Sequence, residues 1–315
     1  MSSSKISLRN KIRDPQAWKR FFSKQGDYLK MLPTIQRLRW QAWLLHFSGL
    51  GAYKQLTEKE LLATRKSDTL FLFGSGYSIN QLTPAECRYF ERHNTMSFNW
   101  FAHQNLLRID YHIAREITAP PPYLNRVFHW VRNLNSYARL LKKPFYANTI
   151  YILQKGWMAI SSNRLIGLSL LPSGARIFRY TLRSRGKWEP PTDSLSKGIV
   201  HGPGSLAECV NFAYAMGWKH IVLVGVDLYD SRYFWLPPEG MRSEDAHLHN
   251  YTTSDSPHAT GRWMIDFMAY WKPLLEAKNV RVEIYNPKSL LNSVFRVFDR
   301  SVILESQELT HADAH

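Results

Sequence analysis

The side chains best suited to chemistry are concentrated in residues 199–233, where Ser205, Asp227, Tyr229 and Tyr233 occur. Ser205 follows a glycine-containing turn and opens a predicted helix, whose first N–H groups can bind an anion. The other three follow a predicted buried strand, and ligands of open α/β sheets collect at the carboxyl ends of strands. These residues are therefore candidates for a ligand site. A buried helix and strand joined by an ordinary polar turn would give the same pattern.

A helix and a strand must position these residues. Apolar residues at helical spacing predict a helix from Ser205 to Met216, with Ser205 as its N-cap and Gly217 as its stop. The nearly unbroken β-branched run His220–Val226 is typical of a parallel strand that is buried on both faces. This pair predicts one unit of an open parallel α/β sheet.

A second candidate site is a glycine turn that follows the short apolar run Thr69–Phe73. The turn reads Gly74-Ser75-Gly76-Tyr77-Ser78, and such strand–turn–helix patterns let backbone N–H groups approach a phosphate. It is not a full G-x-G-x-x-G motif, and no G-K-[ST] follows it, which argues against a Walker-type ATPase. The turn alone is a weak signal.

The remaining pattern extends the sheet. Thr83 and Glu86 form a capping box at a helix start. Apolar runs bounded by turn residues predict further strands and a helix: strands at Thr95–Phe101 with Asn99 near its end, Leu107–Tyr111, Asn148–Gln154, Arg176–Arg183 and Val280–Tyr285, and a helix at Arg262–Lys278. The predicted fold is α/β, with a Rossmann-like, mostly parallel sheet flanked by helices.

The predicted domain organisation has three parts. Residues 1–66 form a basic helical N-terminal region, residues 67–300 form one catalytic domain, and residues 301–315 form a tail. Residues 117–198, which begin near a run of three prolines and lack regular alternation, are expected to be an insertion or lid within the domain.

Composition narrows the class of protein. The 315 residues are 44% hydrophobic, which is enough for a large core. The two cysteines, Cys87 and Cys209, fall in predicted helices and provide neither a disulfide framework nor a zinc spacing. The N-terminus lacks a signal-peptide core, and no window approaches 18 apolar residues. We therefore expect a cytoplasmic protein without a transmembrane helix.

The positive charge is large and unevenly placed. The net charge is +16; residues 1–40 hold ten Lys/Arg against two Asp, and residues 117–188 hold twelve Lys/Arg and no acid. Such blocks suit an anionic partner. Residues 35–50 combine tryptophan, leucine and arginine, so this helix either lies in a membrane interface or packs on the domain.

The order of four motifs resembles the bacterial sialyltransferases of glycosyltransferase family 42. Their G-N-G-P-S-L turn corresponds to residues 74–79, and their C-N-Q-F strand end to residues 98–101. Their central serine, A-L-G-Y-K-E-I and G-I-D-F-Y segments correspond to Ser205, residues 215–221 and residues 225–229, with a second tyrosine at Tyr233. Their P-N-S-L-L turn corresponds to residues 287–291. The resemblance covers residues 69–115 and 199–295.

This resemblance implies the sialyltransferase-type variant of the GT-A fold and an inverting, metal-independent transfer from a CMP-activated nonulosonic acid to a glycan or glycolipid hydroxyl. It also implies the donor-binding residues: Gly74, Ser75, Gly76 and Ser78 for the phosphate and ribose, Asn99 for donor hydroxyls or cytosine, and Gly204 and Ser205 for the sugar carboxylate. Asp227 is expected to tie the strand end to neighbouring backbone. No cofactor or metal is expected.

The resemblance also implies the catalytic residues. Tyr229 and Tyr233 stand where the family has two tyrosines, whose hydroxyls can stabilise a departing phosphate. His258, in a loop before the last helix, is the expected general base. An ungapped alignment places Arg262 at the base position instead, and His247 and His249 are the fallback histidines.

Two other functions remain open. A pyrophosphokinase-like phosphotransferase would need Mg²⁺ and clustered carboxylates, which are sparse beyond Asp227 and Asp230. A basic nucleic-acid-binding protein would account for the charge, but no helix-turn-helix, RNP or zinc pattern supports it, so no nucleic-acid partner is expected. The leading prediction is a cytoplasmic glycosyltransferase attached to the anionic inner face of the cell membrane, and a homo-oligomer is a further expectation.

Overall fold

The chain folds around one nine-stranded sheet. The computed structural model describes residues 33, 36–48, 50–115, 134–157, 159–183, 188–229, 233–235 and 260–303, with backbone alone at 260–262. The sheet order is β1-β6-β5-β4-β3-β2-β9-β10-β11, and all its named strand pairs are parallel. The strands are β1 Lys54–Gln55, β2 Thr69–Phe73, β3 Asn94–Phe98, β4 Tyr111–Ala114, β5 Ile150–Gln154, β6 Arg176–Tyr180, β9 His220–Val224, β10 Arg281–Ile284 and β11 Arg296–Val297. The predicted α/β class with a mostly parallel sheet is confirmed.

The direction of strand succession reverses between β2 and β9. From β2 the chain adds β3, β4, β5 and β6 on one side, and it then crosses back to place β9 on the other side of β2. Leu70 lies opposite Ile221, and Phe73 opposite Val224, so both strands reach the same edge together. Ligands of open α/β sheets bind at such a switch point. A separate two-stranded sheet pairs β7 Leu182–Arg183 with β8 Ile199–Val200.

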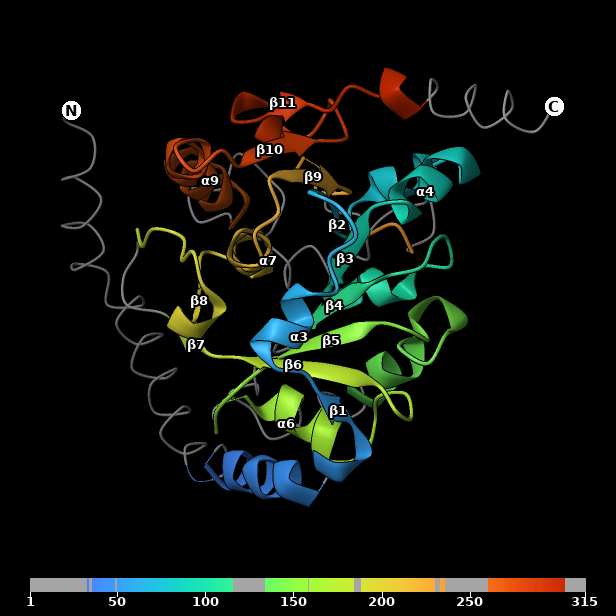
Figure 1. Ribbon diagram of the computed structural model, residues 1–315, viewed down its shortest axis with the longest axis vertical. Coiled ribbons are helices and arrows are strands. Elements are labelled where there is room, and N and C mark those ends of the chain that lie inside the picture. The colour runs from blue at the N-terminus through green and yellow to red at the C-terminus, as the bar shows by residue number, and fades with distance from the viewer. Residues whose placement is uncertain are drawn as a thin grey trace, which may run out of the picture.

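The helices cover both faces of the sheet (Figure 1). Alternate residues of β2 enter different cores: Leu70 and Leu72 pack with residues of α7 and α9, whereas Phe71 and Phe73 pack with residues of α4 and α6. This double burial is why the strands read as continuous apolar runs. The α-helices are α3 Glu58–Leu62, α4 Pro84–Glu91, α6 Ile160–Gly167, α7 Ser205–Ala215 and α9 Thr260–Glu276, and residues 36–48 and 134–140 are also helical. The 3₁₀-helices are η1 Leu50–Ala52, η2 Tyr77–Gln81, η3 Asn99–His103, η4 Pro144–Tyr146, η5 Leu195–Lys197 and η6 Leu290–Ser293.

The helix ends follow their local sequence with one exception. The Thr83 capping box is present, because Thr83 Oγ1 accepts from the Glu86 N–H and the Glu86 carboxylate accepts from the Thr83 N–H. The α7 helix ends before Gly217, whose φ of 87° suits glycine. The exception is its start, where Gly204 is the N-cap and Ser205 is the first helical residue. Ser205 is therefore not the cap that the sequence predicted.

Three strand predictions need correction. The predicted strand Arg176–Arg183 is divided, because β6 ends at Tyr180 and Leu182–Arg183 form β7 of the separate two-stranded sheet. β3 ends at Phe98, and residues 99–103 form a 3₁₀-helix, so Asn99 is the first residue beyond the strand. The predicted strand 107–111 is wrong, because β4 begins only at Tyr111.

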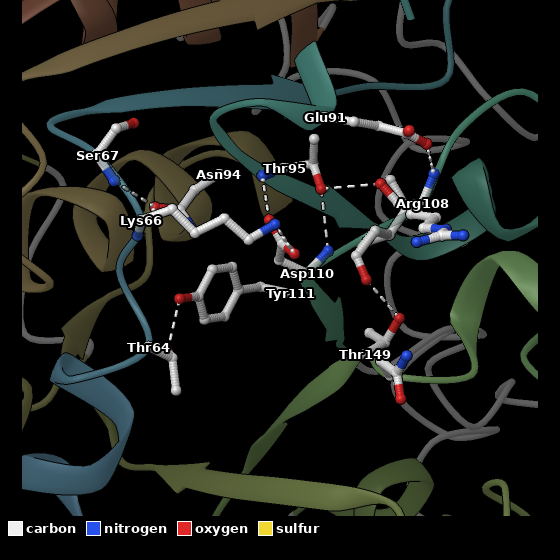
Figure 2. Close-up of polar contacts among 12 residues, drawn as sticks. Thr64, Lys66, Ser67, Glu91, Asn94, Thr95, Arg108, Asp110, Tyr111 and Thr149 are labelled. Atoms are coloured by element: carbon white, nitrogen blue, oxygen red, sulfur yellow. Dashed lines mark hydrogen bonds and ion pairs between the residues drawn. The ribbon is translucent and has the colours of Figure 1, made fainter. Parts of the chain in front are cut away.

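The polar contacts at the amino ends of the strands explain the late start of β4 (Figure 2). The Asp110 carboxylate accepts hydrogen bonds from the Thr95 N–H (2.9 Å) and the Lys66 ammonium (2.6 Å). The carbonyl of Arg108 accepts from Thr95 Oγ1 at 2.9 Å, and the N–H of Ile109 is bonded to the Phe145 carbonyl. These bonds hold the apolar residues of this run in a loop.

The expectation of a lid over residues 117–198 is wrong for β5 and β6, which are inner strands of the main sheet. The N-terminal region likewise contributes β1 at the edge beside β6, so it is not purely helical. Residues 1–32 and 304–315 lie outside the described residues. In the described part of the chain, none of the helices combines the length and the apolar character that crossing a bilayer requires.

Candidate active site

The loops after β2 and β9 are in direct contact at the switch point. The Gly74 N–H donates to the Val224 carbonyl at 2.7 Å, and the Gly76 N–H donates to the Gly225 carbonyl at 2.7 Å. A Cβ on Gly74 would lie 2.6 Å from the Gly225 oxygen, so only glycine allows this approach. Both glycine N–H groups therefore already donate to carbonyls of the protein. Phosphate binding by the turn stays a prediction, and it rests most directly on Ser75, which lies between the two glycines.

Asp227 joins the same two loops. Its buried carboxylate accepts hydrogen bonds from the Ser78 N–H (2.9 Å), from Ser78 Oγ (2.5 Å) and from Asn286 Nδ2 (2.8 Å). A Cβ on Gly76 would collide with this carboxylate. Asp227 therefore ties the strand end to its neighbours, as the sequence analysis expected.

Asn286, which follows β10, extends the site to a third loop. Its Nδ2 donates to the hydroxyl of Tyr229 at 3.1 Å as well as to Asp227. Tyr229 is 39% exposed, so its ring is partly open to solvent. The preceding Leu228 has a φ of 61°, which is strained for a branched residue and costs about 1–3 kcal/mol. The backbone is thus held in an unfavourable conformation just before the candidate tyrosine.

The segment 233–235 lies against the glycine turn. Tyr233 forms an isolated antiparallel bridge with Gly76, and the Phe234 N–H donates to the Ser75 carbonyl at 3.3 Å. Asn80 Nδ2 donates to the Phe234 carbonyl at 3.0 Å. The second candidate tyrosine therefore borders the same turn as Asp227, as the sequence predicted for a common site.

A stack of three rings fixes Tyr233. Its ring stacks on Trp235 with centroids 4.5 Å apart, and Trp235 stacks on His103 at 4.6 Å. Burial, with a smaller contribution from the charge of Lys143, lowers the pKa of His103 to about 4. His103 is therefore a neutral aromatic ring near neutral pH.

Asn99 and Ser205 are brought together from the ends of β3 and the start of α7. Asn99 Nδ2 donates to Ser205 Oγ at 2.7 Å. Asn99 has a φ of 48°, a conformation that asparagine tolerates better than most residues. Its Oδ1 is buried and has no hydrogen-bond partner in the described structure. An acceptor left without a donor is costly, so this oxygen is suited to a ligand N–H or O–H.

A charged cluster that the sequence analysis missed lies one turn further along α7. The buried Glu208 pairs with Arg115 Nε at 2.9 Å and accepts from the Tyr180 hydroxyl at 2.9 Å. His201 Nε2 is 2.7 Å from Arg115 Nη2 and can only accept there, so His201 Nδ1 donates to Glu208 at 2.6 Å. Burial and then the Glu208 charge raise the pKa of Tyr180. The cluster places a guanidinium at the carboxyl end of β4, beside the strand that Asn99 follows.

The position of Arg115 directly after a strand could have identified it from the sequence. Polar residues that follow strands are candidates, and Arg115 directly follows β4 as Asn99 follows β3. The predicted strand 107–111 ended too early for this position to be noticed. Asn286 directly follows the predicted strand Val280–Tyr285 and gives the same signal, but the Asn-Pro pair also predicts an ordinary strand stop.

Several predicted residues cannot be placed. His247, His249 and His258 lie outside the described residues, and for Arg262 the structure describes only the backbone, within α9. The identity of the general base therefore stays a prediction. Among the residues whose positions are described, no group of three or more His, Cys, Asp or Glu side chains is arranged to hold a metal ion.

The sequence matches no known protein-family model, and no curated protein is significantly similar to it. Among solved structures, the fold is similar to that of the monofunctional alpha-2,3-sialyltransferase Cst-I from Campylobacter jejuni. The two proteins share 14% sequence identity over 73% of this chain and 80% of that chain, with a TM-score of 0.43. A likeness this distant assigns no function, and the function has to be argued from the site.

Proposed function

We propose that the protein is an inverting glycosyltransferase that moves an acidic nonulosonic sugar from a CMP-activated donor to a hydroxyl of a glycan or glycolipid. The observation that carries the proposal is the convergence of the motif residues at the switch point. The glycine turn, the Asn99–Ser205 pair and the Asp227–Asn286–Tyr229 chain come from distant segments and border one edge of the sheet.

The donor meets complementary groups in this arrangement. The Asn99 oxygen, buried without a partner among the described residues, accepts from the cytosine amino group or a ribose hydroxyl. The start of α7 carries the partial positive charge of a helix N-terminus and the Ser205 hydroxyl, which together bind the sugar carboxylate. Arg115 adds a positive charge nearby, and Glu208 fixes the orientation of its guanidinium.

The transfer needs charge stabilisation and one proton acceptor. The acceptor hydroxyl attacks the anomeric carbon on the side opposite the phosphate, while His258 takes up the hydroxyl proton. The bond from the anomeric carbon to the phosphate oxygen breaks, and CMP leaves with the bonding electrons. Hydroxyls of Tyr229 and Tyr233 donate to the phosphate oxygens as their charge grows. The configuration is inverted because a single displacement occurs, and the proposed mechanism requires no metal.

We also propose that the protein works in the cytoplasm at the inner face of the cell membrane, where glycolipid acceptors are present. Bilayer attachment would raise the local concentration of such an acceptor. A homo-oligomeric state stays a prediction.

The first test is thermal stabilisation by cytidine nucleotides. CMP and CDP should raise the melting temperature without Mg²⁺, while ADP, GDP and UDP should not. Ligand at about 100 times its Kd adds roughly 2.7 kcal/mol to the free energy of unfolding. Asn99→Ala should remove the shift, and Asn148→Ala, an exposed asparagine before the amino end of β5, should retain it. Stabilisation by ATP only with Mg²⁺ would contradict the proposal and favour a phosphotransferase.

A further inference from the structure

A cluster of exposed aromatic side chains lies far along the sheet from the switch point, at its β1 edge. The helix of residues 36–48, blue at the bottom of Figure 1, packs beside α6. Ala42 is fully buried there, and Ser48 Oγ is 3.3 Å from the Gly167 carbonyl. A Cβ on Gly167 would collide with the Leu45 backbone, so the contact is close. The helix is therefore docked on the domain by one face.

The opposite face of this helix is apolar and open. Trp40 is 58% exposed, Leu44 59% and Phe47 54%, and their spacing places them on one side of the helix. Trp157, which follows β5, is 44% exposed beside them. Gln36, Trp40, Trp43 and Trp157 line a cavity of about 440 Å³. We call the surface formed by Trp40, Leu44, Phe47 and Trp157 the tryptophan face. Large exposed apolar patches of this kind mark interaction sites.

The segments that build the tryptophan face carry positive charge and no acid of their own. Residues 28–57 and 117–188, which include the helix, β5, α6 and β6, contain no Asp or Glu. Arg39 lies with its Cζ 5.3 Å from the centre of the Trp157 ring, and its buried Nε has no hydrogen-bond partner in the described structure. A guanidinium nitrogen with no acceptor, next to an apolar cavity, points to an anionic group of a ligand.

A second guanidinium lies behind this surface. Arg179 is buried, and it donates to the Gln154 carbonyl (2.6 Å), Asn163 Oδ1 (2.8 Å) and His46 Nδ1 (2.9 Å), which are neutral acceptors. Burial lowers the pKa of Arg179 to about 10, so it remains charged at neutral pH. With no acid in the neighbouring segments, its field adds to that of Arg39.

We infer that the tryptophan face docks on the surface of an anionic phospholipid bilayer, with a lipid glycerol or acyl segment in the cavity and a lipid phosphate at Arg39. Tryptophan rings and arginine together suit the boundary between headgroups and acyl chains. Trp157 follows the carboxyl end of β5, so this part of the face lies on the carboxyl-end side of the strands, as the candidate active site does. Docking on the bilayer is inferred from the tryptophan face itself. Only its role, which is to bring the active site to a membrane-bound acceptor, rests on the proposed function.

The test is sedimentation of the full-length protein with vesicles. The protein should bind vesicles of phosphatidylcholine mixed with phosphatidylglycerol and should not bind phosphatidylcholine alone. Trp40→Ala combined with Leu44→Ala should weaken binding at least about tenfold, because two exposed apolar side chains are lost. Arg39→Gln should weaken it about fivefold, as expected for one cation near an anionic surface. Trp188→Ala is the matched control, since Trp188 is also 44% exposed, and it should bind as the wild type does.

Other outcomes would overturn the inference. Equal vesicle binding by the Trp40→Ala, Leu44→Ala variant would do so, as would a wild-type protein that ignores anionic vesicles. A wild-type dimer that this variant dissociates, without vesicle binding, would show that a second copy covers the face. A lower melting temperature with unchanged vesicle binding would show that the chain itself covers it. Stabilisation by CMP, measured on the same samples, reports the proposed function separately, since the face contains no donor-binding residue.

Discussion

The side-chain amide of Asn286 donates hydrogen bonds to both the Asp227 carboxylate, at 2.8 Å, and the Tyr229 hydroxyl, at 3.1 Å. One amide thereby couples a buried structural carboxylate to a partly exposed tyrosine. Because Asp227 also accepts from Ser78, a single chain of hydrogen bonds joins the loops after β2, β9 and β10. The orientation of Tyr229 depends on this chain.

Replacing Asn286 by alanine should affect stability and activity together. Asp227 would lose one donor, which should lower the free energy of unfolding by about 1–3 kcal/mol. Tyr229 would lose its positioning contact, and a misplaced catalytic group can reduce kcat by up to about 100-fold. Urea unfolding and initial transfer rates would measure the two effects. Asn148→Ala, an exposed asparagine before the amino end of β5, is the control and should change neither. Full transfer activity in Asn286→Ala would contradict the assigned role.

Gly76→Ala should destabilise the fold because the added methyl group meets the Asp227 carboxylate. Overpacking of a tight site costs about 1–3 kcal/mol, and the expected loss lies in that range. Gly51→Ala is the matched control, since nothing lies within 4 Å of a Cβ at that position. Thermal unfolding of both variants would compare them, and equal melting temperatures would show that the β2 and β9 loops can separate freely.

Arg115→Met should be strongly destabilising. The buried Glu208 carboxylate would lose its guanidinium partner, and an uncompensated buried charge costs about 3–5 kcal/mol. Arg108→Met removes an exposed arginine near the opposite edge of the sheet and should cost little. Denaturant titration is the measurement. If Arg115→Met unfolds like the wild type, the pairing of Arg115 with Glu208 contributes nothing to stability.

Conversion of Tyr229 or Tyr233 to phenylalanine should lower kcat while leaving the fold intact. Loss of one preorganised donor to a developing charge typically costs about 100- to 1,000-fold in kcat. Tyr214→Phe, a half-buried tyrosine on α7, is the control. Unchanged kcat in both site variants, with CMP binding preserved, would remove the tyrosines from the mechanism.

Stability should fall as the pH is lowered from 6.5 towards 4. The pKa of His103 is about 4 in the folded protein, against 6.5 as its ordinary value, because burial disfavours the imidazolium. Between these values the unfolded chain binds more protons than the folded one, so acid favours unfolding. His103→Phe keeps a ring against Trp235 and removes this titration, and its stability should depend less on pH across the window. Urea unfolding at several pH values measures how the free energy of unfolding changes with pH. An identical pH dependence in the wild type and in His103→Phe would exclude His103 as a cause of the acid destabilisation.

Much of the sheet could be predicted because its strands are buried on both faces. After their first residues, the runs at Thr69–Phe73 and His220–Val224 are apolar throughout, and no amphipathic alternative competes with that pattern. The run 107–111 failed because Leu107 and Ile109 are buried within a loop, where contacts with distant residues replace strand pairing. A local run of apolar residues indicates that the segment is buried. It does not distinguish a buried strand of the sheet from a buried loop.

Some residues of the candidate site could be predicted from the sequence and others could not. Asn99, Ser205 and Asp227 were identifiable because each lies at the end of a strand or the start of a helix. The role of Asn286 depends on contacts across 59 and 57 residues of chain, so no short-range pattern contains it. The cluster of Arg115, His201 and Glu208 likewise requires the neighbouring positions of β4 and α7, which only the folded sheet provides.

The place of β2 in the sheet has a consequence for synthesis of the chain. Its partner on one side, β9, is made long afterwards, as the 149-residue separation of Ser78 and Asp227 shows. At about 5–20 residues per second, roughly 7–30 seconds pass before β9 follows β2 out of the ribosome. During that interval one row of β2 backbone groups has no strand to pair with, and an unpaired apolar edge is a template for aggregation. The nascent protein is therefore most vulnerable while its future active site is only half made.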